Sequence, residues 1–97
     1  MNLFDATIPL QDETFSTLLE HKNVKIVRIV SSSNLEVCEY LQREDEWVVV
    51  VQGKANILTD NQEKTLYQGD SLFIPSQTKH SVQSVEDGTI WLAIHIY

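Results

Sequence analysis

The sequence predicts an all-β domain, and three observations support this fold class. Short segments rich in β-branched and aromatic residues alternate apolar and polar positions, as half-buried strands do. Glycine, aspartate and asparagine stand between these segments at the spacing of turns. A carboxylate and an imidazole, Glu46 and His80, fall on two of the expected strands. Together these features predict one small barrel whose strands carry polar groups on a face that is otherwise apolar.

The alternating pattern begins at Val24 and continues to the end of the chain. The expected strands are residues 24–31, 35–41, 47–52, 55–59, 64–67, 71–74, 80–85 and 89–96. About eight short strands at this spacing is the number typical of a jelly roll.

The segment before these strands has a different pattern. Residues 11–21 carry Phe15, Leu18 and Leu19 at i, i+3, i+4 spacing, and Asp12 is available as an N-cap. We therefore expect one short amphipathic helix ahead of the barrel.

Composition limits the class of protein. A chain of 97 residues is long enough for one domain, so we expect residues 1–97 to form a single unit. No apolar run approaches the roughly 20 residues of a membrane span, and the first residues do not resemble a secretory signal, so a cytoplasmic location is expected. The single cysteine, Cys38, fits a reducing compartment. A net charge of −7 argues against nucleic acid and anionic membranes as partners.

Five positions form a recognisable spacing. Glu46 precedes Gly53 by seven residues, and Gly69, Pro75 and His80 follow at intervals of six and five. This pattern resembles the paired sequence motifs of the cupin family, and the resemblance extends over residues 34–84. It implies a double-stranded β-helix, or jelly-roll barrel, for the whole domain.

The resemblance also implies a site inside the barrel. Most metal-binding cupins have two histidines before the glutamate of the first motif, and here these positions hold Tyr40 and Gln42. A divalent transition metal would have Glu46 and His80 as firm ligands, with Gln42 as a further oxygen donor. Two firm ligands are fewer than the three or four of a typical protein zinc site. We therefore expect a weakened metal site at most, and favour a ligand pocket lined by the same four residues.

Two further residues have donor atoms. Cys38 could supply a thiolate, but a free cysteine is more often a small buried apolar residue, which is the interpretation we favour. His95 shares strand parity with Trp91 and could face the pocket. The alternate face of that strand is more apolar, so we expect it to fill the core and His95 to point outward. The residues of this alternate face are Ile90, Leu92, Ile94 and Ile96.

The strand around Glu46 is apolar on both faces. With Glu46 inward, the period of two places Val48 and Val50 inside and Trp47, Val49 and Val51 outside. So large an exposed apolar stripe needs cover on a small domain. The expected helix and a second subunit are the candidates, and we expect a homodimer.

Three functions fit these features. The leading one is binding of a small molecule in the barrel pocket formed by Tyr40, Gln42, Glu46 and His80. The first alternative is a metal-dependent enzyme of the oxygenase or isomerase type. The second is a degenerate barrel that associates with another protein through the Trp47 face. The residues leave open whether the protein catalyses a reaction, because this fold hosts many functions.

Overall fold

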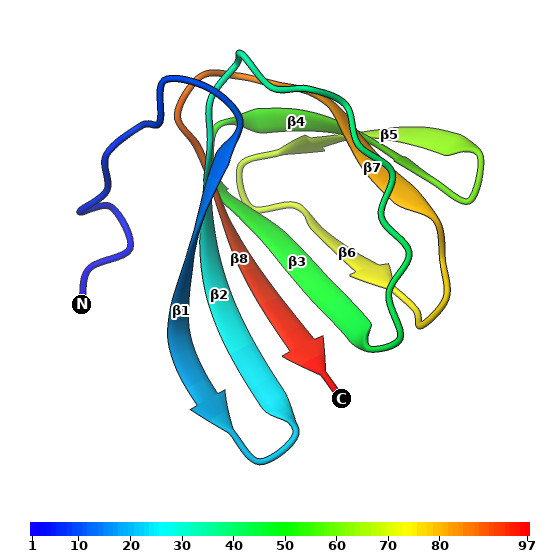
Figure 1. The fold of residues 1–97 in the computed structure, drawn as a ribbon. Helices are drawn as coiled ribbons and strands as arrows, with labels where there is room; N and C mark the ends of the chain where they lie inside the picture. Colours follow the sequence, from blue (N-terminus) through cyan, green and yellow to red (C-terminus); the bar gives the residue numbers. More distant parts are fainter.

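Two antiparallel sheets face one another in the computed structural model, which describes all residues from 1 to 97 (Figure 1). The strands are β1 (Glu13–His21), β2 (Val24–Ser31), β3 (Asp45–Gln52), β4 (Lys54–Thr59), β5 (Gln62–Tyr67), β6 (Ser71–Ile74), β7 (His80–Val85) and β8 (Thr89–Ile96). The larger sheet has the order β1-β2-β8-β3-β6 and the smaller one β5-β4-β7. The expected all-β jelly-roll class is confirmed, and four of the expected strands have the bounds that the sequence predicts: β2, β6, β7 and β8.

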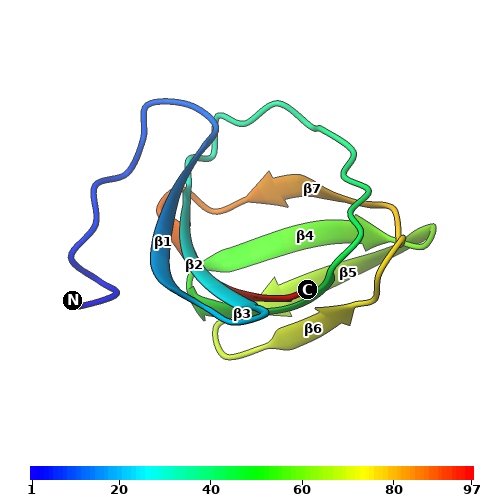
Figure 2. The ribbon, with the colours of Figure 1, turned by 60° about the horizontal axis from the view of Figure 1, so that its bottom comes forward.

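The core lies between the two sheets. Figure 2 shows the strands of the larger sheet curving around one side of this space, with β4 and β7 on the other. The fully enclosed apolar side chains come from both sheets, and they include Val50, Ile57, Ile74 and Ala93. Because the core fills only part of the space between the sheets, polar side chains can line the remainder.

The predicted N-terminal helix is wrong. Residues 13–21 form β1, an edge strand that pairs antiparallel with β2. The register shifts between Thr17 and Leu19, so Leu18 is the extra residue of a β-bulge. The bulge interrupts the alternation with a period of two and leaves Phe15, Leu18 and Leu19 at a spacing that imitates a helix. Pairing with β2 overrides the local helical pattern.

The predicted strand at residues 35–41 is also wrong. This segment is irregular except for one isolated bridge, in which Tyr40 and His80 exchange backbone hydrogen bonds of 2.7 and 3.0 Å. Gln77 donates a further backbone hydrogen bond to the Gln42 carbonyl at 2.8 Å. These contacts hold the segment beside β7 without making it a strand.

The faces of β3 are as predicted. Glu46, Val48 and Val50 point into the barrel and are 7%, 3% and 0% exposed, whereas Trp47 is on the outer face and is 36% exposed. The faces of β8 are opposite to the prediction. Trp91 is buried inside, and it brings His95 to the inner side. The core accepts the less apolar face of β8 because register with β3 pairs His95 with the inward Glu46.

No helix of the structure has the length and apolar character needed to span a membrane.

Gly53 occupies a position that only glycine fits. Its φ is +97°, and a Cβ added there would overlap Oγ1 of the buried Thr89 and lie 2.9 Å from its Cα. Gly69 has a similar φ of +89° but open space around it. A substitution of Gly53 would therefore cause both backbone strain and steric overlap, whereas a substitution of Gly69 would cause backbone strain alone.

We expect Gly53→Ala to lower the free energy of unfolding by about 3 kcal/mol or more, since strain and overlap add. Gly69→Ala should cost only about 1–2 kcal/mol, the strain alone. Urea denaturation of both variants measures the difference, and equal losses would contradict the close packing of Gly53 on Thr89.

Candidate functional site

The site is a cavity between the two sheets with a volume of about 110 Å³. Four strands and the irregular segment before β3 contribute its polar side chains. These are Glu13, Tyr40, Gln42, Glu46, His80 and His95. All four pocket residues expected from the sequence therefore lie around one cavity.

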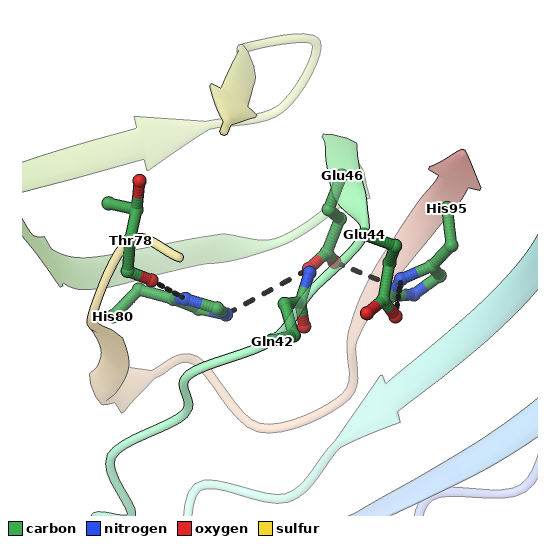
Figure 3. A network of polar contacts seen from close by, with 6 residues as sticks. All are labelled: Gln42, Glu44, Glu46, Thr78, His80 and His95. Atoms are coloured by element: carbon green, nitrogen blue, oxygen red, sulfur yellow. Dashed lines mark hydrogen bonds and ion pairs between the residues drawn. The ribbon is translucent and has the colours of Figure 1, made fainter. Parts of the chain in front are cut away.

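The Glu46 carboxylate lies between two imidazoles (Figure 3). Its Oε1 is 3.8 Å from Nε2 of His80, and its Oε2 is 3.9 Å from Nε2 of His95. The Gln42 side-chain amide donates a hydrogen bond of 2.9 Å to the same Oε1. Both imidazole contacts are longer than a hydrogen bond, so the Nε2 atoms remain available to a bound molecule.

The far side of each imidazole is held by an oxygen atom. His80 Nδ1 lies 3.0 Å from the Thr78 carbonyl, which orients the ring and favours a proton on Nδ1 (Figure 3). His95 Nδ1 lies 3.1 Å from the Glu44 carboxylate, in ion-pair distance but without the alignment of a hydrogen bond. The ring of His80 also stacks on Tyr40, with the centroids 5.7 Å apart. These contacts direct both Nε2 atoms toward Glu46.

A second carboxyl group lines the cavity from the edge strand β1. Glu13 accepts a hydrogen bond from the Ser31 hydroxyl, which in turn accepts a hydrogen bond of 3.0 Å from the indole of Trp91. Burial raises the pKa of Glu13 above its ordinary value, although the Ser31 hydrogen bond opposes this. The cavity thus contains a carboxyl group that keeps its proton to a higher pH than an exposed glutamate does.

Tyr40 is a neutral hydroxyl group in this environment. Burial raises the pKa of its phenol, and the nearby Glu13 carboxylate raises it further. A phenol binds a metal ion as the phenolate, which needs the opposite shift. Tyr40 is therefore suited to hydrogen bonding and unsuited to replacing the imidazole that most metal-binding cupins have at its position.

The donor atoms present do not fit a metal ion. No group of three or more His, Cys, Asp or Glu side chains is arranged to hold one. Cys38 is exposed and is absent from the cavity lining, so the expectation that it is buried is wrong. Neither sulfur nor phenolate completes a ligand set around Glu46 and His80.

His95 corrects one expectation from the sequence, because it faces the cavity where an outward position was expected. Glu13 and Trp91 are further lining residues that sequence reasoning missed. The parity of β8 links Trp91 with His95, and burial of the tryptophan could have signalled that face. Glu13 gave no such signal, since it lies in the segment with the helical spacing.

The double-sheet barrel and its inward Glu46 and His80 define the class of protein as a cupin. A family model for the mannose-6-phosphate isomerase C-terminal domain matches residues 13–96, nearly the whole chain. A crystal structure from Ralstonia eutropha JMP134, provisionally described as a mannose-6-phosphate isomerase, is 35% identical with a TM-score of 0.90. The match covers 99% of this chain and 95% of that one. The chain belongs to the mannose-6-phosphate isomerase C-terminal family of cupins.

More distant structures share the fold. An RmlC-like cupin from Shewanella frigidimarina NCIMB 400 is 22% identical, has a TM-score of 0.79, and matches over 92% of this chain and 83% of its own. The Cnp3 cupin domain of Schizosaccharomyces pombe is 11% identical with a TM-score of 0.85. That match covers 98% of this chain and 71% of the Cnp3 domain chain. At 22% and 11% identity, the likeness of these two structures to this chain shows the fold alone. None of the curated protein sequences matches this chain.

The metal content of the purified protein tests the fit of the donor set. Because Tyr40 and Gln42 replace imidazoles, we expect clearly less than one transition metal ion per chain after purification without a metal-affinity step. Elemental analysis measures this ratio. Stoichiometric metal that survives dialysis against a chelator would contradict the prediction.

The raised pKa of Glu13 predicts how stability depends on pH. In the folded protein Glu13 holds its proton above the ordinary pKa of 4.5, so folding takes up a proton in the pH range just above that value. The free energy of unfolding should fall as pH rises through this range, and Glu13→Gln should remove that part of the fall.

Urea denaturation between pH 4.5 and pH 8 measures the effect. The stability of Glu13→Gln relative to the wild type should increase with pH. Glu20→Gln, on the exposed end of the same strand, should run parallel to the wild type. A Glu13→Gln curve that is also parallel would show that burial does not shift this carboxyl group.

Proposed function

We propose that this cupin domain binds a small polar molecule in the cavity between its sheets. The observation that supports this most is the Glu46 carboxylate, 7% exposed, beside two imidazoles whose Nε2 atoms lack hydrogen-bond partners. Polar groups removed from water are normally satisfied by hydrogen bonds within the protein. Groups left free around a cavity can instead be satisfied by a ligand.

The walls of the cavity supply the apolar contact that such a ligand needs. Val48, Ile57, Ile74 and Trp91 line it beside the polar groups. A few fixed polar groups on an otherwise apolar wall is the arrangement common to small-molecule sites. The polar groups then orient the ligand, and the apolar wall contributes affinity.

A second candidate is an isomerase that moves a proton between adjacent carbon atoms. Glu46 offers a carboxylate base, and His80 in its doubly protonated form offers a proton donor beside it, which is what such a reaction needs. The Ralstonia eutropha relative, with its description as a mannose-6-phosphate isomerase, also favours this class. Incorporation of deuterium from D2O next to the carbonyl of a hydroxy-carbonyl compound, lost in Glu46→Gln, would support catalysis over simple binding.

A panel of small neutral, cationic and anionic molecules screened by ligand-observed NMR tests the binding proposal. For any molecule that binds, Glu46→Gln and His80→Ala should each weaken affinity by about tenfold or more, since each removes a hydrogen bond to a polar or charged group. His21→Ala is the matched control, because His21 is exposed at the hairpin between β1 and β2. Binding that both site variants leave unchanged would place the ligand elsewhere and contradict the proposal.

A further inference from the structure

The charges around the cavity disfavour an anionic ligand. No lysine or arginine lines it, and Lys25, the in-register neighbour of His95 on β2, is not among the lining residues. The acidic groups are Glu13 and Glu46 in the wall and Glu44 beside His95. Even with both imidazoles protonated, two positive charges would face three carboxyl groups, in a chain of net charge −7. Phosphate recognition in proteins relies on arginine, lysine or helix N-termini, and this cavity has none of them.

The size of the cavity also disfavours a phosphate ester as its ligand. Its volume of about 110 Å³ is below the 300–1,000 Å³ typical of ligand pockets. A cavity of roughly 150 Å³ holds benzene, which has six non-hydrogen atoms. A sugar phosphate is too large to lie wholly within it.

We infer that the cavity takes a compact, uncharged molecule bearing hydroxyl or carbonyl groups, of roughly four to six non-hydrogen atoms, and rejects its phosphate ester. This inference rests on the proposed binding function and specifies its ligand. Hydroxyl groups of the ligand donate to the Glu46 carboxylate and to Nε2 of His80, whose proton lies on Nδ1, and its oxygen atoms accept from the Tyr40 hydroxyl. Its carbon skeleton lies against the indole of Trp91.

Dihydroxyacetone and dihydroxyacetone phosphate form a matched pair of probes, because they differ by the phosphate alone. NMR titrations at low ionic strength follow the imidazole signals of His80 and His95 and the indole signal of Trp91. We expect dihydroxyacetone to shift all three, and its phosphate to bind at least tenfold more weakly. Phosphate binding as tight or tighter would overturn the inference and leave the cavity as the binding site. If neither probe shifts these signals, the inference fails, and the proposed function fails with it only if no molecule of the panel binds in the cavity.

A charge variant tests the electrostatic reason for this preference. Glu44→Gln should narrow the difference in affinity between the two probes, because it removes a negative charge beside His95. Glu63→Gln lies on exposed β5 in the other sheet and changes the net charge equally, so it should leave this difference in affinity unchanged. Equal effects of the two variants would overturn the electrostatic reason.

Discussion

The carboxylate of Glu46 is the group on which the arrangement of the site depends. It lies inside the barrel at 7% exposure, where an unpaired charge would be costly. Gln42 donates a hydrogen bond to it, and two imidazoles flank it at nearly 4 Å. The irregular segment before β3, the start of β7 and the end of β8 are thereby brought to one place. The same group is thus both a structural centre of the polar network and a hydrogen-bond acceptor for a ligand in the cavity.

Strand alternation explains why this site and the apolar outer face occur together. Successive residues of β3 point to opposite sides of the larger sheet, so Glu46 faces the cavity and Trp47 faces outward. The register with β8 carries the same division across the sheet, with His95 inside and Ile94 outside. A one-residue slip would exchange the two faces and destroy both, so one register specifies the cavity and the outer surface.

Sequence reasoning found most of the barrel and four residues of the cavity, because both follow from local alternation and motif spacing. It failed where a long-range contact decides the outcome. The bulge at Leu18 disguised β1 as a helix, and only pairing with β2 makes it a strand. The inner face of β8 was assigned by hydrophobicity alone, whereas register with Glu46 turns His95 inward. The sequence does not indicate Glu13 as a cavity residue, because Glu13 lies on β1, the strand whose spacing resembles that of a helix.

The most direct test asks whether one carboxylate organises both imidazoles. NMR of the histidine side-chain nitrogens in the wild type and in Glu46→Gln compares three histidines in one experiment. The signals of His80 and His95 should change together, while the exposed His21 should not change. A proton on Nδ1 of His80 in the wild type is also expected, given the Thr78 carbonyl beside it. If His95 stayed unchanged with His21, it would not face Glu46, and the site would be reduced to Glu46 and His80.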